Sequence, residues 1–378
     1  MSIAQVDQAR YGEQLSAKVQ RVKAKFTDFV APELEVFESP CEHYRMRAEF
    51  RVWHDGSDAY YIMFQKPADN SEQRHERVRI DHFPVGSLLI NELMKKLMEE
   101  VHEQPVLKTK LYQVNFHTTL TGHAMVTMIY HKKLGLDWQE AAKKLRPVLG
   151  SCPSSTRPFV DIIGRSHKQK VELETGFVCE TLSVDGHDFT YKQVEGAFSQ
   201  PNGRMCEKML TWARDVTRNS TDHDLLELYC GNGNFTVALA SNFRRVVATE
   251  MSKASVAAAE FNLQANGVSN TKIARLTAEE FTAAWTGARE FERAKTLDLK
   301  CHNLQTILVD PPRAGCDADT ATLLKEFKNV VYISCNPETL HSNLLELKDS
   351  HNIQRFAIFD QFPYTDHIEC GVYLTQKD

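Results

Sequence analysis

Long apolar runs are absent from this sequence of 378 residues. A helix that crosses a bilayer needs about 20 consecutive, mainly apolar residues, and no stretch approaches that length. The first thirty residues also lack an apolar segment of signal-peptide length. We therefore expect a cytoplasmic protein that makes no membrane contact and has enough length for two domains.

Cysteine pairs with metal-ligand spacing are also missing. The nine cysteines are an odd number spread over the whole chain, and no Cys-x-x-Cys pair occurs. This pattern argues against a disulfide framework and against a four-thiolate metal or iron–sulfur site. We expect neither a metal nor an iron–sulfur cluster in this protein.

An overall positive charge, which many nucleic-acid binders carry, is lacking too, because the formal net charge is −5. The charge is unevenly distributed, however. Residues 105–171 contain 11 Lys and Arg against three Asp and Glu, a local charge of +8 that leaves −13 for the rest. Lysines on the solvated face of a helix would explain part of this excess. A selective binder of a phosphate backbone would carry the same patch, and RNA binding by this segment should then weaken steeply with salt.

The sequence pattern changes near residue 200. Upstream, alternating apolar and polar runs are separated by glycine-containing turns, which predicts antiparallel hairpins at about residues 48–64, 111–131 and 162–173. Helices are predicted at about residues 5–30 and 86–101. Downstream, apolar strands alternate with helices. This alternation is typical of a parallel, doubly wound sheet that binds ligands beyond the carboxyl ends of its strands.

The first chemical signal is the strand–loop–helix sequence LLELYCGNGNFT at residues 225–236. Gly231 and Gly233 would let backbone N–H groups approach a ligand at the start of the next helix. Glu250 ends the following strand, close to where an acid would bind ribose hydroxyl groups. A third glycine three residues on is missing, so a pyrophosphate fits poorly. A ligand with adenosine but no pyrophosphate, such as S-adenosylmethionine, fits better, and a purely structural turn is the alternative.

Two further strand ends carry reactive side chains. Asp310 follows an apolar strand and precedes two prolines, which fix the backbone at that point. Cys335 ends the apolar run VVYIS and precedes an Asn-Pro turn. Because both strands belong to the same predicted sheet, we expect the two side chains at one edge of it, facing the ligand crevice. A turn-forming Asp-Pro is the alternative for Asp310.

Cys335 itself has two interpretations. Free cysteine is among the most buried residue types, so a cysteine that ends an apolar strand is by default part of the core. The turn that follows would instead place the thiol at the mouth of the crevice, and a helix beginning near Glu338 would lower the thiol pKa below about 8.5. A base would then be needed, and Glu369 lies between a polar turn and the last apolar strand.

Six segments together resemble the bacterial tRNA uracil-5-methyltransferase family, whose members make 5-methyluridine at position 54 in the T loop of tRNA. The segments are AFSQPN, LELYCGNGNF, VVATE, ILVDPPRAG, YISCNPETL and FDQFPYTDHIECGVYL, which span about residues 197–374, and VNFHTTL and YHKKL in the N-terminal half are similar too. The resemblance implies an α/β protein with two domains. Residues 1–195 would form an RNA-binding α+β domain rich in hairpins, and residues 196–378 a Rossmann-like, S-adenosylmethionine-dependent methyltransferase domain.

The resemblance also implies the roles of individual residues. Cys335 corresponds to the nucleophile that adds to C6 of uracil, and Glu369 to the base that removes the C5 proton after methyl transfer to C5. Arg313 would help to orient the target base. The implied partner is the T arm of tRNA, or another RNA with a similar loop, bound by a monomeric enzyme. The residues expected to contact S-adenosylmethionine are Gln200, Tyr229, Asn234, Glu250 and Asp310.

The target uridine would have to be flipped out of a folded loop, at a cost of a few kcal/mol. The basic segment would hold phosphates, and Tyr60, Tyr61 and Phe64 could stack on unpaired bases. Aromatic residues that alternate in hairpins are more often part of a core. No recognition residue is therefore assigned in this half of the chain.

Three alternatives remain open. The rRNA uracil-5-methyltransferases share these motifs, but they often carry a cysteine-ligated iron–sulfur cluster and an extra β-barrel domain, for which this chain lacks clustered cysteines and room. RNA cytosine-5-methyltransferases place Pro-Cys after the acidic strand end, where this chain has Asp310-Pro311-Pro312-Arg313. An RNA-binding folding assistant, in which methylation is incidental, would keep its full biological effect after Cys335→Ala.

Overall fold

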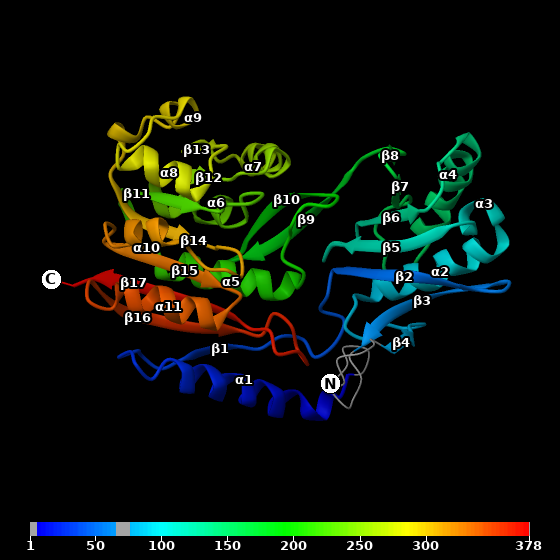
Figure 1. Ribbon diagram of the computed structural model, residues 1–378, viewed down its shortest axis with the longest axis horizontal. Helices are drawn as coiled ribbons and strands as arrows, with labels where there is room; N and C mark the ends of the chain where they lie inside the picture. The colour runs from blue at the N-terminus through cyan, green and yellow to red at the C-terminus, as the bar shows by residue number, and fades with distance from the viewer. Residues whose placement is uncertain (1–5, 66–75, 378) are drawn as a thin grey trace.

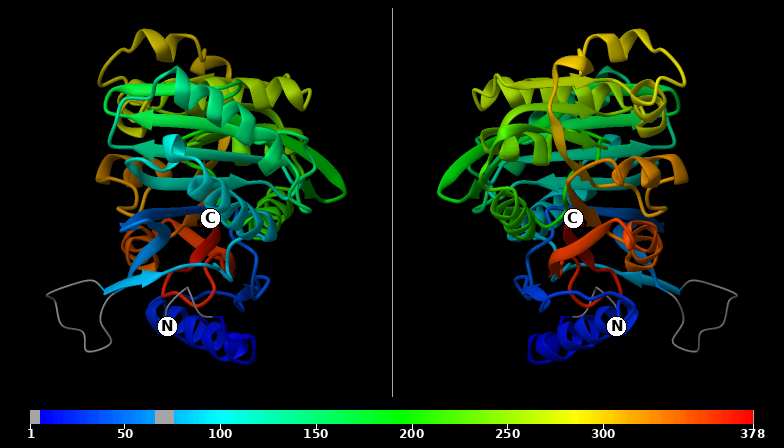
Figure 2. Two further views of the ribbon diagram at one scale, coloured as in Figure 1. Left: turned by 90° about the vertical axis from the view of Figure 1, so that its right-hand side faces the viewer. Right: turned by 90° about the vertical axis from the view of Figure 1, so that its left-hand side faces the viewer.

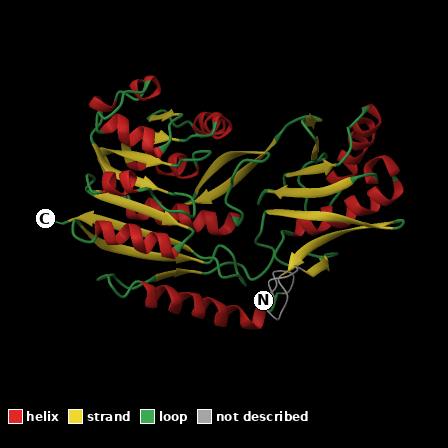
Figure 3. Ribbon diagram, in the orientation of Figure 1, coloured by secondary structure: helices red, strands yellow, loops and turns green. Residues whose placement is uncertain are grey.

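The computed structural model describes residues 6–65 and 76–377, and its strands form two large sheets and one separate hairpin. A seven-stranded sheet occupies one half of the molecule and an eight-stranded sheet the other (Figures 1 and 3). The hairpin of β9 (Phe177–Val184) and β10 (His187–Val194) lies between the two sheets. No helix within the described residues is long and apolar enough to cross a membrane.

The eight-stranded sheet has the order β1-β16-β17-β15-β14-β11-β12-β13. The five consecutive strands β15, β14, β11, β12 and β13 pair in parallel, while β17 runs antiparallel to both β15 and β16. The predicted doubly wound parallel sheet is therefore confirmed, with an antiparallel extension at one side. The strands are β1 (Glu35–Phe37), β11 (Ser220–Leu228), β12 (Phe243–Thr249), β13 (Thr271–Ala274), β14 (Leu304–Val309), β15 (Asn329–Ser334), β16 (His351–Phe359) and β17 (Glu369–Gln376).

Helices cover both faces of this sheet because its strands are apolar on both sides. In β15, Val330 and Tyr332 belong to one buried cluster, while Val331 and Ile333 belong to another on the opposite face. The helices around this sheet are α1 (Tyr11–Lys25), α5 (Gly203–Val216), α6 (Asn234–Leu239), α7 (Lys253–Ala265), α8 (Ala278–Trp285), α9 (Glu292–Lys295), α10 (Ala318–Leu324) and α11 (Pro337–Leu347).

The N-terminal segment packs on the eight-stranded sheet rather than on the sheet that follows it in sequence. Strand β1 pairs in parallel with β16, and Val22 and Phe26 of α1 join the buried cluster that contains Phe356. In both views of Figure 2, α1 lies at the lower edge of the molecule. The division of the chain at residues 195 and 196 stays a prediction, but this strand and helix lie with the C-terminal half.

The seven-stranded sheet has the order β4-β3-β2-β5-β6-β7-β8. The three predicted hairpins are confirmed, because β2–β3, β5–β6 and β7–β8 all pair antiparallel. Strands β6 and β7 pair in parallel, however, through the crossover helix α4 (Leu136–Gly150). The strands are β2 (Arg47–Asp55), β3 (Asp58–Gln65), β4 (Glu76–Arg79), β5 (Leu111–Thr118), β6 (Ala124–Tyr130), β7 (Asp161–Ser166) and β8 (Gln169–Glu172).

One face of this sheet carries its helices, and the other carries polar side chains. Phe50 and Val52 of β2 are buried in a cluster with residues of α2 (Leu88–Glu103), α3 (Pro105–Lys108) and α4. Arg47, Glu49 and Arg51 alternate with them and point the other way, as the period of two in a strand requires. The predicted helix at residues 86–101 corresponds to α2. The helix predicted at residues 5–30 is α1, and Gln5 lies outside the described residues.

The β9–β10 hairpin, which no sequence signal singled out, connects the two halves by hydrogen bonds. The buried carboxylate of Glu180 accepts the Leu120 N–H, with oxygen–nitrogen distances of 3.0 and 2.9 Å. On the other side, the Tyr191 hydroxyl donates to the Asn234 carbonyl at 2.9 Å. The hairpin thus positions the glycine-containing loop ahead of α6 relative to the seven-stranded sheet.

Candidate active site

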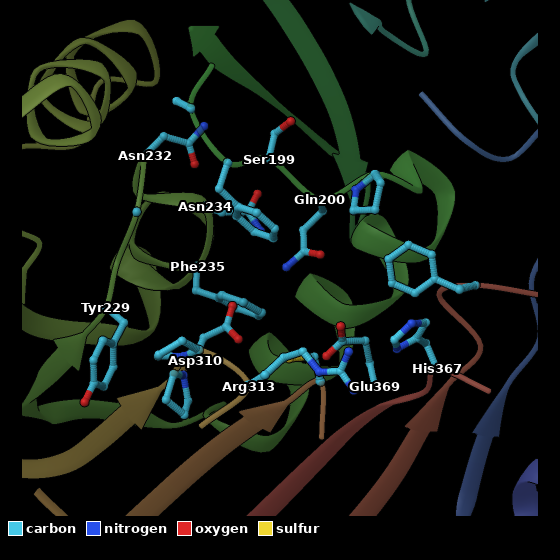
Figure 4. A pocket seen from close by; sticks show the side chains of 18 of the residues that line it. Ser199, Gln200, Tyr229, Asn232, Asn234, Phe235, Asp310, Arg313, His367 and Glu369 are labelled. Carbon is cyan, nitrogen blue, oxygen red and sulfur yellow. The ribbon is translucent and has the colours of Figure 1, made fainter. Parts of the chain in front are cut away.

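A cavity of about 1710 Å³ lies beyond the carboxyl ends of β11, β12, β14 and β15. All eight side chains that the sequence singled out for catalysis, base orientation or cofactor binding line it, and so does Gly231, whereas Gly233 does not. In Figure 4, polar side chains from separate strands and loops surround one central space. The residues brought together are Gln200, Tyr229, Asn234, Glu250, Asp310, Arg313, Cys335 and Glu369.

The loop after β11 adopts a conformation that only some residues tolerate. Tyr229, Gly231 and Gly233 all have positive φ values, of 62°, 56° and 78°. At Gly233 a side chain would also press on Ala259, because an added Cβ would lie 3.3 Å from the Cβ of that residue. The Tyr229 hydroxyl points away from the central space (Figure 4). Tyr229 therefore presents its ring and backbone to the cavity, not its hydroxyl group.

Glu250 holds this loop in place from the end of β12. Its carboxylate accepts the Gly231 N–H at 3.1 Å and the Ser252 N–H at 2.7 Å. Each oxygen keeps a second lone pair and the residue lines the cavity, so the side chain can still accept a hydrogen bond from a ligand hydroxyl group. The position agrees with the ribose-binding role expected for this acid, which stays a prediction.

Gln200 is positioned by a residue that the sequence analysis quoted in a motif but did not single out. The buried Gln361 donates from Nε2 to Oε1 of Gln200 at 2.6 Å. The Oε1 atom of Gln361 is buried and has no partner within the described residues. This pair leaves the amide group of Gln200 free to donate into the cavity.

Asp310 and Arg313 occupy the loop after β14. The Asp310 carboxyl group has no hydrogen-bond partner within the described residues, and burial raises its pKa to about 7. The Arg313 backbone is fixed by the next strand end, since Asn336 Nδ2 donates to its carbonyl oxygen at 2.9 Å. The Asp310 carboxyl group is therefore available to a ligand in the cavity, and a cation would favour its ionised form.

Cys335 lies at the end of β15, half-buried at the wall of the cavity, and not in the core. The helix that follows begins at Pro337, close to the predicted position. The prediction that this helix lowers the thiol pKa is nevertheless wrong. Burial, with the carboxylates of Glu369 and Asp310, raises the pKa of Cys335 to about 11, since removal from water and nearby negative charge both disfavour a thiolate.

Glu369 is the first residue of β17 and is only 6% exposed. Burial, reinforced by Asp310, raises its pKa well above the usual value, and Arg313 acts in the opposite direction. No hydrogen bond joins its carboxyl group to another described residue. Figure 4 places Glu369 beside Arg313, with both side chains directed at the central space.

The positive charge at this cavity does not come from the basic segment. None of the Lys and Arg in residues 105–171 lines it; the cations that do are Arg10, Lys18, Arg21, Arg45 and Arg313. Within the segment, Arg146, Arg165 and Lys170 pair with glutamates that follow it in sequence. The net charge of +8 therefore overstated the free positive charge of that segment.

The aromatic residues considered for base stacking have different environments. Tyr61 is buried and donates its hydroxyl to the Met94 carbonyl at 3.2 Å, so it belongs to the core. Phe64 is exposed, and the Arg79 guanidinium covers the ring of Tyr60 at 4.5 Å. Neither Tyr60 nor Phe64 lines the cavity.

The lining fits a nucleoside that carries a positive charge. Three carboxyl groups, those of Glu250, Asp310 and Glu369, face the same space, and the glycine loop admits a ligand to the backbone. S-adenosylmethionine combines ribose hydroxyl groups with a sulfonium and an ammonium cation. Within the part of the chain that the structure describes, no group of three or more His, Cys, Asp or Glu could hold a metal ion.

Comparisons with known proteins agree over the whole chain. A family model described as tRNA (uracil-5-)-methyltransferase matches residues 10–377. Curated proteins called tRNA/tmRNA (uracil-C(5))-methyltransferase from Chromohalobacter salexigens and Vibrio parahaemolyticus are both 52% identical over all of this chain and over 98% and 100% of their own lengths. The crystal structure of Pyrococcus abyssi tRNA (uracil-54, C5)-methyltransferase with S-adenosyl-L-homocysteine has a similar fold, with a TM-score of 0.69, 21% identity and coverage of 97% of this chain and 83% of that chain.

Proposed function

Because the chain belongs to the tRNA (uracil-5-)-methyltransferase family and is thus an S-adenosylmethionine-dependent enzyme, we propose that it methylates C5 of a uridine in the T loop of tRNA. The product would be 5-methyluridine at position 54. The names of the relatives also include tmRNA, so a T-like loop in that RNA is a second substrate of the same chemistry. The enzyme would act as a monomer in the cytoplasm.

One observation carries this proposal: a thiol and a carboxyl group without hydrogen-bond partners among the described residues face one cavity. Cys335 comes from the end of β15 and Glu369 from the start of β17, and these two strands are neighbours in the sheet. A nucleophile and a base at adjacent strand ends can act on the two ends of the same C5–C6 bond. The arrangement supports addition to a ring and later removal of a proton from it.

The chemistry requires both groups. The Cys335 thiol first releases its proton to water, which the positive charge of Arg313 favours, and the thiolate adds to C6 of uracil. The electron pair of the C5–C6 bond moves to C5 and O4, which makes C5 nucleophilic. S-adenosylmethionine, when bound, supplies an electrophilic methyl group for C5. Glu369 then accepts the C5 proton, the C5–C6 double bond re-forms, and Cys335 leaves as a thiolate. The residues proposed to hold S-adenosylmethionine are Gln200, Tyr229, Asn234, Glu250 and Asp310.

Arg313 influences both reacting groups. Its positive charge lowers the pKa of Cys335 and of Glu369, against the effects of burial and neighbouring carboxylates. In the proposed reaction, Arg313 also donates to the uracil O4 or O2, where negative charge develops after the addition. It thereby connects orientation of the base with activation of the thiol.

The proposal is tested with an unmodified T-arm RNA hairpin and labelled S-adenosylmethionine. We expect wild-type protein to incorporate label at uridine C5 and Cys335→Ala to incorporate none. Glu369→Gln should accumulate an RNA–protein adduct that survives denaturation, because the covalent intermediate cannot lose its C5 proton. Cys301→Ala is the matched control, since this exposed cysteine lies outside the cavity.

The outcomes separate the alternatives. Full methylation by Cys335→Ala would refute the covalent mechanism. An rRNA fragment methylated in preference to the T arm would move the enzyme to the rRNA branch. A folding assistant would be favoured if Cys335→Ala, while inactive in methyl transfer, still restored the full effect of the wild-type protein on tRNA folding.

A further inference from the structure

A second, smaller cavity of about 390 Å³ opens beside the large one. The two share five lining residues, Arg45, Phe198, Ser199, Pro201 and Phe362, so they lie side by side. The remaining walls of the second cavity come mainly from β2 and β3 of the seven-stranded sheet. It therefore lies where the two halves of the molecule meet, beside the cavity that Cys335 and Glu369 line.

Two arginines in this cavity form no ion pair with a carboxylate among the residues that the structure describes. Arg45 donates from Nε to the Arg47 carbonyl at 2.7 Å, and Arg47 donates from Nη1 to the Ala197 carbonyl at 2.9 Å and the Ser199 hydroxyl at 3.3 Å. All these acceptors are neutral. Within the described residues, neither guanidinium lies in an ion pair with a carboxylate, and burial lowers the pKa of both from the usual value.

An unpaired, partly buried cation is costly, and a bound anion offsets that cost. The two Nη atoms of Arg45 have no hydrogen-bond partner among the described residues, whereas Arg47 is engaged by the segment before Gln200. The planar fork of arginine matches two oxygens of a phosphate group. Glu49 also lines the cavity, and its negative charge opposes the effect of burial on the pKa of both arginines. It forms no ion pair with either of them among the described residues, and its carboxylate accepts from Gln113 Nε2 at 3.3 Å.

The cavity also offers aromatic surface. Phe198 is 71% exposed, an unusual position for a large apolar side chain, and it lines both cavities. The ring of Phe362 lies below the Arg45 guanidinium, 5.6 Å from the ring centroid. Aromatic faces beside a positive charge are the usual platform for an unstacked base and its phosphate.

From this arrangement we infer that the second cavity binds the nucleotide adjacent to the methylated uridine. Arg45 binds the phosphate that links the two nucleotides, and the neighbouring base packs on Phe198. The inference rests on the proposed RNA substrate. It also gives a reason for the position of Phe198: flipping one uridine out of the loop displaces its neighbour, which then needs a new surface on which to stack.

The test combines a protein variant with a change in the RNA. T-arm hairpins would carry a single neutral methylphosphonate at each linkage on either side of the target uridine. For wild-type protein, one of these linkages should weaken binding about 10-fold, the loss typical of one charge-assisted contact. Arg45→Gln should bind unmodified RNA about 10-fold more weakly and show no further loss with that methylphosphonate. An abasic neighbour on the same side should weaken binding to wild-type protein but not to Phe198→Ala.

Salt dependence provides a second readout. The slope of log K against log salt concentration should fall by about 0.7–0.9 for Arg45→Gln, because one phosphate contact is lost. Arg45→Lys, which keeps the charge, should retain the wild-type slope. Arg293→Gln is the matched control with the same charge change, because Arg293 lies on α9 and lines neither cavity. It should change neither affinity nor slope.

The inference is overturned if Arg45→Gln keeps the RNA affinity and the salt slope of wild-type protein. It is also overturned if the methylphosphonate weakens binding to Arg45→Gln as much as it weakens binding to wild-type protein. If Arg45→Gln does not fold, the methylphosphonate scan on wild-type protein decides, and uniform binding across the linkages next to the target uridine counts against the inference. Failure of the proposed function is a different result: wild-type protein would then transfer no methyl group to the unmodified hairpin.

Discussion

The ion pair between Lys18 and Asp360 allows a quantitative prediction about the loop that leads to Glu369. Lys18 Nζ lies 2.6 Å from Asp360 Oδ1, and the two side chains are 5% and 0% exposed. Lys18 also donates to the Phe362 carbonyl at 2.9 Å, and Gln14 donates to the second oxygen of Asp360 at 2.9 Å. Helix α1 thus holds the loop between β16 and β17 from outside the sheet.

At this distance, an effective dielectric constant of about 20 gives an attraction of about 6 kcal/mol before the cost of desolvation is subtracted. Removing one partner of a buried pair leaves the other charge uncompensated, which costs about 3–5 kcal/mol. We therefore expect Lys18→Met to reduce the free energy of unfolding by that amount. The double variant Lys18→Met with Asp360→Asn should recover part of the loss, because no uncompensated charge remains.

The assay is urea denaturation followed by far-ultraviolet circular dichroism, with all four proteins of the double-mutant cycle. Lys23→Met is the control for helix α1, since Lys23 is exposed. Under native conditions, Lys18→Met should lower kcat for methyl transfer because the loop to Glu369 shifts. A stability within about 0.5 kcal/mol of wild type, or additive effects in the cycle, would refute this account of the pair.

Two further predictions concern protonation. Glu227 of β11 is buried, accepts the Thr236 hydroxyl at 2.6 Å, and has a pKa raised to about 8 by burial. Between about pH 4.5 and pH 8 the folded chain holds a proton on Glu227 that the unfolded chain releases, so the free energy of unfolding should fall as the pH rises through this range. In thermal denaturation at pH 9, Glu227→Gln should be more stable than wild type, by no more than about 5 kcal/mol. Equal pH profiles of the two proteins would contradict this prediction. The alkylation rate of Cys335 by iodoacetamide, corrected with Cys335→Ala, should rise with pH towards a midpoint of about 11. Asp310→Asn should lower that midpoint and Arg313→Gln should raise it, whereas a wild-type midpoint near 8.5 would show that the thiol is not perturbed.

Much of the candidate site was predictable because it lies at the ends of regular parallel strands. Asp310 and Cys335 each follow an apolar run that ends in a proline-containing turn, and a parallel sheet brings such ends to one edge. Glu369 was harder to place, because β17 runs antiparallel and contributes its first residue to that edge. Glu369 was identified from its resemblance to the family motif FDQFPYTDHIECGVYL, and not from the alternation of strands and turns.

Other parts of the fold lacked a local signal. Strand β1 has only three residues, too few to show a period of two, and its partner β16 lies more than 300 residues later. The parallel pairing of β6 with β7 was not predicted, because strand patterns carry no sign of the direction in which the strands pair. The prediction of a lowered pKa for Cys335 was wrong for a similar reason. The start of the following helix can be seen in the local sequence, but Glu369 and Asp310, whose carboxylates raise this pKa, are brought close to Cys335 only by the fold.

Charge gives the clearest example of this limit. A window along the sequence counts Arg146, Arg165 and Lys170 as free cations, although each lies beside a glutamate in the folded chain. Arg45 lies outside that window, in the part of the chain whose net charge is −13, yet it faces the cavity without a carboxylate in an ion pair with it among the described residues. Electrostatic attraction of RNA depends on charges that remain uncompensated after folding. For this reason we expect Arg45→Gln to change the salt dependence of RNA binding more than Arg165→Gln, although only the latter falls in the segment with the excess of positive charge.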